Sequence, residues 1–164
     1  MISRRMGPVF RSYDRGATWS DPVLFGIDIF DPHFMLFPNG VLACFHGSYK
    51  GGGLRVILSG DDGYTWHGPA EGVGYAVDPT VYGYCHGIML EDGSAYLVYL
   101  HTGGHDPHDA RTEAVWGLRV RPHDDACGID ILPAPGSPRD LGSEFSEKEG
   151  IRFHGGDPIL GILV

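Results

Sequence analysis

The feature of this sequence that most constrains its fold is an octet that occurs twice. Residues 12–19 read Ser-Tyr-Asp-Arg-Gly-Ala-Thr-Trp, and residues 59–66 read Ser-Gly-Asp-Asp-Gly-Tyr-Thr-Trp. Both copies follow the pattern Ser-x-Asp-x-Gly-x-Thr-Trp and begin 47 residues apart in a chain of 164 residues. So many fixed positions rarely recur by chance, and self-similarity at such a spacing is typical of repeat architectures. The chain is therefore expected to contain copies of one small structural unit.

A second repeat lies between the octets and predicts paired strands. The segment 33–40 matches the segment 86–93 at an offset of 53 residues. In each segment an apolar run is followed by Asn-Gly or Asp-Gly and then by another apolar run. This order is a strong local signal for a β-hairpin, because Asn-Gly and Asp-Gly suit tight turns. Each unit is therefore expected to open with a hairpin.

A third match completes the unit. Leu-Arg-Val at 54–56 recurs at 118–120, ahead of the second octet and of a degenerate third octet at 123–128. The third octet has lost its Thr-Trp pair, and we expect Ile129 or Ile131 to take over the packing role. A hairpin, a strand, an octet turn and a further strand over about 50 residues are typical of a propeller blade. The expected divisions are 1–30, 31–77, 78–133, and a polar connection with the start of a further strand at 134–164.

The octet resembles the Asp box, or BNR repeat, of the sialidase (neuraminidase) superfamily. The resemblance implies an all-β fold: a partial six-bladed β-propeller of about two and a half four-stranded antiparallel blades. It also implies a sialidase-like exo-glycosidase that acts, in its full-length parent, on terminal sialic acid or a similar glycan residue. A non-catalytic propeller module that binds glycan or protein is the alternative, because a propeller fold does not by itself fix function.

The octet residues are expected to be structural. The Asp carboxylate should accept hydrogen bonds from backbone N–H groups of its own turn, and the Gly should supply a positive φ. The Trp should cover the turn and pack between sheets. These structural residues are Ser12, Asp14, Gly16, Trp19, Ser59, Asp61, Gly63 and Trp66.

The blade order places the octets and the hairpin turns on one face and the remaining loops on the opposite face. The second of those loops, from His101 to about 117, is the longer one, and loops on rigid scaffolds often carry function. Three interpretations stay open for it. Arg111 could clamp a sugar carboxylate with Glu113 as base, or the loop could simply form a polar rim. A metal site is the third possibility, with His101, His105, His108, Asp106 and Asp109 as its donors.

The resemblance implies a tyrosine nucleophile activated by a glutamate, an arginine clamp for the substrate carboxylate, and an aspartate acid/base. The catalytic candidates are Arg111, Glu113 and Tyr82, with Tyr84 as the alternative tyrosine. The substrate-binding candidates are His101, His105, Tyr49, His86 and Asp78. His33 occupies the position equivalent to His86, where a polar side chain either satisfies backbone groups or contacts a ligand. Arg55 and Arg119 recur at one strand position, which favours a structural role.

Composition narrows the classes of partner. The formal net charge is −9 and only two lysines occur, which disfavours nucleic acid and anionic membranes. No apolar run is long enough to span a membrane. We expect no cofactor and no resident metal. Further blades or self-association would be needed to close a ring.

Three cysteines, Cys44, Cys85 and Cys127, lie in or near apolar runs, and we expect them to be small buried hydrophobic residues. The N-terminal residues carry charge without an apolar stretch behind them, unlike a signal peptide. The compartment stays open, because a longer parent could be cytoplasmic or exported.

Overall fold

The computed structural model describes residues 6–48, 52–69, 73–78, 83–102, 113–132, 146–148, 151–153 and 159–163. These residues contain strands and turns and no helix, so the all-β prediction is confirmed. The strands are β1 (Met6–Val9), β2 (Val23–Asp28), β3 (Phe30–Leu36), β4 (Leu42–Gly47), β5 (Leu54–Ser59), β6 (Tyr75–Asp78), β7 (Gly83–Met89), β8 (Ala95–Thr102), β9 (Glu113–Pro122), β10 (Ile129–Leu132), β11 (Ser146–Lys148), β12 (Ile151–Phe153) and β13 (Ile159–Leu163).

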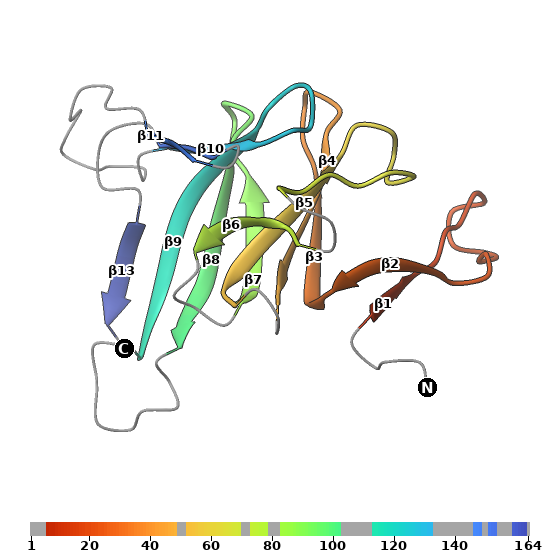
Figure 1. The fold of residues 1–164 in the computed structure, drawn as a ribbon, viewed down its shortest axis with the longest axis horizontal. Coiled ribbons are helices and arrows are strands. Elements are labelled where there is room, and N and C mark those ends of the chain that lie inside the picture. Colours follow the sequence, from red (N-terminus) through yellow and green to blue (C-terminus); the bar gives the residue numbers. More distant parts are fainter. Residues whose placement is uncertain are drawn as a thin grey trace.

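The strands form three sheets, in which neighbours in the chain are mostly neighbours in space (Figure 1). Strands β1 and β2 form an antiparallel pair, and β3-β4-β5-β6 form a four-stranded antiparallel sheet. Strands β7 to β10 pair antiparallel in sequence order within the third sheet. Strands β11 and β12 extend that sheet beyond β10, and β13 pairs with the first half of β9.

Both hairpins predicted from the 53-residue repeat are present. Strand β3 pairs with β4 as far as Leu36 opposite Leu42, and β7 pairs with β8 as far as Met89 opposite Ala95. At each turn the side chain before the Gly accepts a nearby backbone N–H: the Val41 amide bonds Asn39 at 3.2 Å and the Ser94 amide bonds Asp92 at 3.0 Å. Local turn chemistry therefore fixes both connections.

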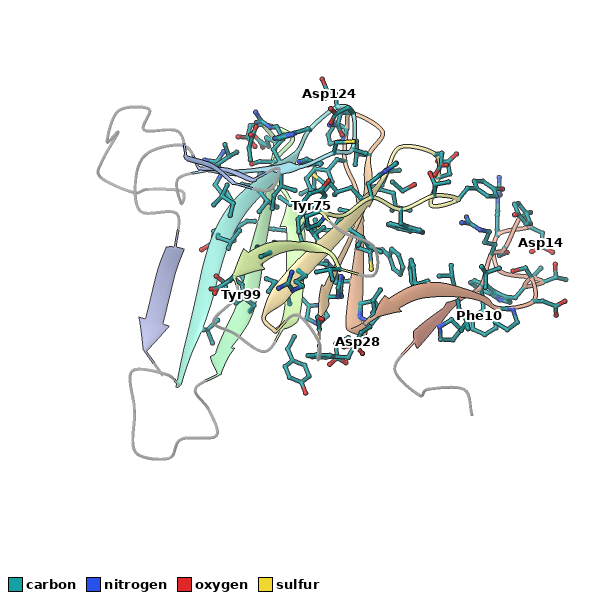
Figure 2. All side chains as sticks on the ribbon, viewed as in Figure 1. Phe10, Asp14, Asp28, Tyr75, Tyr99 and Asp124 are labelled. Atoms are coloured by element: carbon teal, nitrogen blue, oxygen red, sulfur yellow. The ribbon has the colours of Figure 1, made fainter. Side chains whose placement is uncertain are left out.

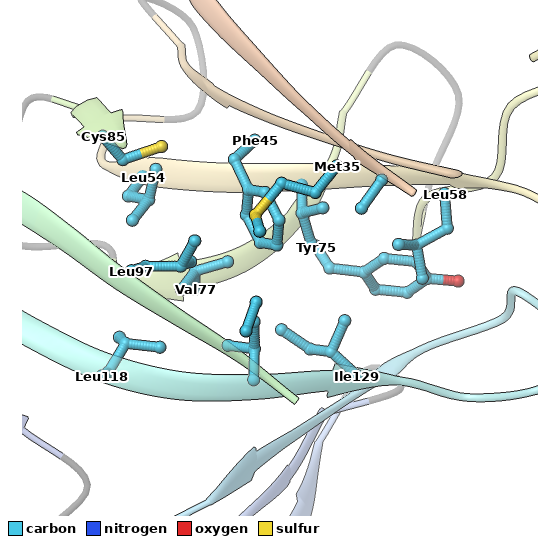
Figure 3. Close-up of a cluster of buried hydrophobic side chains, with 14 of the residues drawn as sticks. Met35, Phe45, Leu54, Leu58, Tyr75, Val77, Cys85, Leu97, Leu118 and Ile129 are labelled. Atoms are coloured by element: carbon cyan, nitrogen blue, oxygen red, sulfur yellow. The ribbon is translucent and has the colours of Figure 1, made fainter. Parts of the chain in front are cut away.

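The main core lies between the second and third sheets (Figure 3). Phe45, Leu54 and Leu58 come from the second sheet, and Leu97 and Leu118 from the third; all are almost completely buried. Each such side chain contributes roughly 1.5–3 kcal/mol when it is removed from water. Ile129 and Ile131, which follow the degenerate octet, are buried in this same cluster.

A smaller cluster joins the first two sheets. Ile29, Cys44 and Ile57 are buried there, with Phe25 and Trp66 packed against them. The rings of Phe25 and Trp66 meet edge to face with centroids 5.1 Å apart. Trp66 therefore packs between sheets, as the octet predicts.

Two expectations about burial were wrong. Trp19 lies beside Gly16 of its own turn, yet it is exposed, because no described strand covers it as β2 covers Trp66. Cys44 and Cys85 are buried as expected, but Cys127 is exposed. It lies in the turn of the degenerate octet, between the buried residues Ala126 and Gly128.

Candidate functional site

Both complete octets fold into the same hydrogen-bonded turn. In the first, the Gly16 amide donates to Ser12 Oγ at 2.6 Å, and the Thr18 amide and hydroxyl donate to the two Asp14 oxygens at 2.8 and 2.6 Å. In the second octet the corresponding distances are 2.7, 2.8 and 2.7 Å. The octet glycines take φ values of 89° and 78°. These bonds and φ values agree with the roles that the octet pattern predicts for Ser, Asp and Gly.

The electrostatics of the two turns agree with a structural role. Hydrogen bonds from Thr18 lower the pKa of Asp14 to about 2, and those from Thr65 lower the pKa of Asp61 to about 2. Each carboxylate accepts three hydrogen bonds from its own turn. A carboxylate held ionised in this way is a poor proton donor.

The octets and the hairpin turns share one edge of the molecule. Arg11, just before the first octet, donates to the carbonyls of Asp62 (2.9 Å) and Gly63 in the second octet. Asn39, in a hairpin turn, donates to the Asp124 carboxylate of the degenerate octet at 3.0 Å. Asp14 and Asp124 accordingly lie on the turn side of the strands in Figure 2, whereas Asp28 lies at the opposite ends. We call this opposite edge the strand-end edge.

The strand-end edge carries a repeated irregularity. Strands β3 and β7 each show a register shift near their start, between Phe30 and His33 and between Gly83 and His86. Inside each shift a non-glycine residue adopts a positive φ: Asp31 at 46° and Tyr84 at 48°. Bulges re-aim side chains, and residues held in this region of φ are frequent at functional sites. Tyr84 and Asp31 are both exposed.

Two histidines follow these irregularities and meet each other. The rings of His33 and His86 lie edge to face with centroids 5.3 Å apart. The Gly87 amide donates to His33 Nε2 at 3.0 Å, so this nitrogen is an unprotonated acceptor. Burial, and then the nearby His86, lower the pKa of His33. His33 therefore satisfies backbone, one of the two roles foreseen for this position, while His86 stays exposed beside it.

Asp78, at the end of β6, is buried and accepts a hydrogen bond from the Tyr99 hydroxyl at 2.9 Å. Burial and the Asp78 carboxylate raise the pKa of Tyr99. A tyrosine with a raised pKa and no exposed surface is a poor nucleophile. In this structure the pair joins the second sheet to the third.

His46 is the equivalent of Tyr99 in the preceding unit, 53 residues earlier. Its Nδ1 donates to the Gly47 carbonyl at 2.9 Å, and its Nε2 is buried without a hydrogen-bond partner among the described residues. The pKa of His46 is lowered to about 4, chiefly by burial and to a smaller extent by the Arg55 charge, while the Gly47 carbonyl and Asp28 oppose the shift. His46 is therefore a neutral, structural histidine near physiological pH. Neither the charge state of His46 nor the bonding of Tyr99 was foreseen, although the hairpin offset pairs the two positions.

The two recurring arginines, Arg55 and Arg119, form hydrogen bonds within the fold. Arg55 donates to the carbonyls of Gly52 and Gly74 at 2.9 and 2.8 Å. Arg119 pairs with Asp92 and donates to Ser94 Oγ at 3.3 Å. These contacts agree with the structural role that their repetition favours.

The remaining site candidates are placed only in part. The backbones of His101 and Glu113 lie on neighbouring strands, where His101 is opposite Ala114 and Thr102 is opposite Glu113. Both positions are at the strand-end edge, but their side chains lie outside the described part of the structure. Tyr49, Tyr82, His105 and Arg111 also lie outside the described residues, as do the loop residues His108, Asp106 and Asp109.

Among the described residues, two hollows open on the octet side. The larger, about 520 Å³, lies between the β1–β2 sheet and the second octet and is lined by Phe25, Tyr64 and Trp66 among others. The smaller, about 390 Å³, lies at the degenerate octet around His123, which bonds Asp130 at 3.1 Å.

Within the described ranges, no three His, Cys, Asp or Glu side chains are grouped so that they could hold a metal ion. The same ranges contain no helix with the length and apolar character that a membrane crossing requires. No protein-family profile, curated protein or solved structure matches this chain. The resemblance to the sialidase superfamily accordingly rests on the octets themselves.

Proposed function

We propose that this chain is part of a six-bladed β-propeller and that its parent is a sialidase-like exo-glycosidase, acting on terminal sialic acid or a similar glycan residue. The observation that supports this most is the pair of octet turns. The same Ser, Asp, Gly and Thr make the same bonds in both. Consecutive four-stranded antiparallel meanders also suit blades of a propeller.

The proposed site lies at the strand-end edge. At the octet edge the Asp14 and Asp61 carboxylates accept hydrogen bonds from their own turns. The strand-end edge presents the positive-φ residues Asp31 and Tyr84 beside His86. Glu113 begins β9 at this same edge. A sugar would therefore meet side chains from two consecutive units there. The long loop that includes Arg111 connects to this edge and would supply the carboxylate clamp.

The proposed chemistry is nucleophilic displacement by a tyrosine. A tyrosine with a pKa near 10 needs a base to attack at neutral pH, and Glu113 is the proposed base. Tyr82 is the proposed nucleophile, with Tyr84 as the alternative because it is exposed. Tyr99 is excluded from this role by its burial and its bond to Asp78. A covalent intermediate on tyrosine followed by hydrolysis would retain the anomeric configuration.

The test is hydrolysis of a fluorogenic sialoside by the longest available parent chain carrying single substitutions. Tyr82→Phe, Glu113→Gln and Arg111→Ala are each expected to lower kcat/KM by about a hundredfold or more. Tyr84→Phe is assayed beside Tyr82→Phe to identify the nucleophile. Tyr64→Phe is the control, because Tyr64 is an exposed tyrosine on the octet side. Unchanged turnover in all of the strand-end variants would refute the site.

A non-catalytic glycan- or protein-binding module is the second candidate. Under this proposal the folded parent would bind sialosides in calorimetry without cleaving them.

A further inference from the structure

The hollow between the β1–β2 sheet and the second octet is open, although the equivalent place in the next unit is filled. Arg11, which lines this hollow, and Leu58 stand 47 residues apart, just before their octets. Leu58 is completely buried and belongs to one cluster with Tyr75 of β6 and Ala126 of the degenerate octet. The counterparts of these two elements, β2 and the second octet, stand on either side of the hollow. The opening is therefore a property of the residues that line it.

Aromatic rings form much of the wall of the hollow. Phe25 and Trp66 line one part of it, with their rings edge to face and their centroids 5.1 Å apart. Tyr13 of the first octet and Tyr64 of the second octet line it as well. These two side chains are 76% and 62% exposed, and their hydroxyls form a hydrogen bond of 3.1 Å. Large aromatic side chains that gather on an exposed surface are typical of binding sites.

The two tyrosines are not part of the repeat. Gly60 stands at the place of Tyr13 in the second octet, and Ala17 stands at the place of Tyr64 in the first octet. Both octets nevertheless form the same hydrogen-bonded turn. An aromatic ring is thus unnecessary for the turn at either place, and the fold alone does not account for the Tyr13–Tyr64 pair.

The charged groups that line the hollow balance each other. Arg11 donates to the carbonyls of Asp62, at 2.9 Å, and Gly63. Its guanidinium lies over the Tyr64 ring, 4.2 Å from the centroid. Asp21 adds one negative charge to the lining. A cationic ligand would be repelled by Arg11, and an anionic ligand by Asp21 and by the net charge of −9. The lining therefore favours an uncharged ligand that has both polar and apolar surface.

We propose that the hollow binds one neutral hexose unit of a glycan. A pyranose ring presents an apolar C–H face, which packs against the aromatic rings, and carries hydroxyl groups at its rim. Hydroxyls both donate and accept hydrogen bonds, so they match the Asp21 carboxylate and the Tyr64 hydroxyl. The hydrogen bond with Tyr13 raises the pKa of Tyr64, so this hydroxyl keeps its proton at neutral pH. A volume of about 520 Å³ falls within the range of small-molecule sites.

This hexose site is separate from the site proposed at the strand-end edge. It lies on the octet side, requires no catalytic group, and takes an uncharged sugar in place of a sugar acid. It does not rest on the glycosidase proposal, because binding of a neutral sugar and hydrolysis of a sialoside are measured independently.

Saturation-transfer difference NMR on the 164-residue chain tests the binding. The probes are the methyl glycosides of glucose, galactose and mannose. At least one of them is expected to bind with a Kd on the order of 1 mM, which is the scale for a ligand of this size. Absence of saturable binding by all three probes would overturn the proposal.

Two substitutions use the difference between the octets. Tyr64→Ala and Tyr13→Gly each introduce the residue that the other octet already carries, so both turns are expected to keep their fold. Each substitution is expected to raise the Kd of the bound glycoside by about tenfold. Trp19→Ala is the matched control and is expected to leave the Kd unchanged, because Trp19 is 63% exposed in the first octet and does not line the hollow.

Circular dichroism checks that each variant is folded, and Tyr13→Ala replaces Tyr13→Gly if the glycine variant is not. An unchanged Kd in Tyr64→Ala, or an equal loss of affinity in Trp19→Ala, would refute the assignment of the site.

Amide chemical shifts locate the bound sugar. The largest changes on binding are expected at Gly63 and Tyr64, which line the hollow, and the smallest at His86 and Gly87, which lie in β7 towards the strand-end edge. The reverse pattern would place the sugar at the strand-end edge and overturn the proposal.

Discussion

His46 gives the sharpest test of how burial controls the protonation of a side chain near the strand-end edge. The pKa of its imidazole is lowered from 6.5 to about 4, chiefly by burial, with Nε2 held against the backbone of Gly74. Below pH 6.5 the unfolded chain takes up a proton that the folded chain refuses, so the free energy of unfolding falls as the pH falls from 6.5 towards 4. Linkage over this range gives a loss of about 2 kcal/mol at pH 5, and about 3 kcal/mol once pH 4 is passed.

The assay is urea unfolding between pH 7.5 and pH 4.5, followed by circular dichroism. The comparison is between the wild-type chain, His46→Gln and His67→Gln; His67 is an exposed histidine on the octet side. His33, whose pKa is also lowered, acts in the same pH window and remains in all three proteins. Between pH 7.5 and pH 5, the free energy of unfolding of His46→Gln is expected to fall by about 2 kcal/mol less than that of the wild-type chain. His67→Gln is expected to show the same fall as the wild-type chain. An unchanged slope in His46→Gln would refute the assignment of a buried neutral histidine.

Two further predictions concern local geometry and buried polar pairs. Gly63→Ala should destabilise the protein more than Gly16→Ala. Both positions have a positive φ, which costs about 1–2 kcal/mol for alanine. A Cβ at Gly63 would also lie only 2.9 Å from Trp66, whereas a Cβ at Gly16 would lie 3.8 Å from Trp19. Thermal melts rank the two, and equal losses would contradict the packing argument. Tyr99→Phe should lower the free energy of unfolding by about 1–3 kcal/mol, because the buried Asp78 carboxylate loses the hydrogen bond from the Tyr99 hydroxyl. Chemical denaturation at neutral pH measures this, and a loss near zero would mean that the hydrogen bond contributes little.

The candidate site could be predicted from the sequence only in part. The repeat identified His33 and His86 as equivalent positions, and the structure brings these two histidines together. The bulges with positive φ could not be read from the sequence, because Asp31 and Tyr84 share no residue type that would signal them. The hydrogen bond from Tyr99 to Asp78 could likewise not be predicted from the sequence, because it joins residues of two different sheets.

The sequence by itself determined the octet turns, the hairpins and the all-β character. Each octet turn is closed by bonds between residues four apart, such as Thr18 to Asp14, so a short stretch of chain contains the whole cause. The tertiary structure alone decided which equivalent residues are buried. Trp19 and Trp66 occupy the same octet position, yet only Trp66 meets Phe25. Burial depends on what another strand brings to the surface. His46 is kept neutral for the same reason, because it is buried with Nε2 beside Gly74, a residue far from it in the sequence.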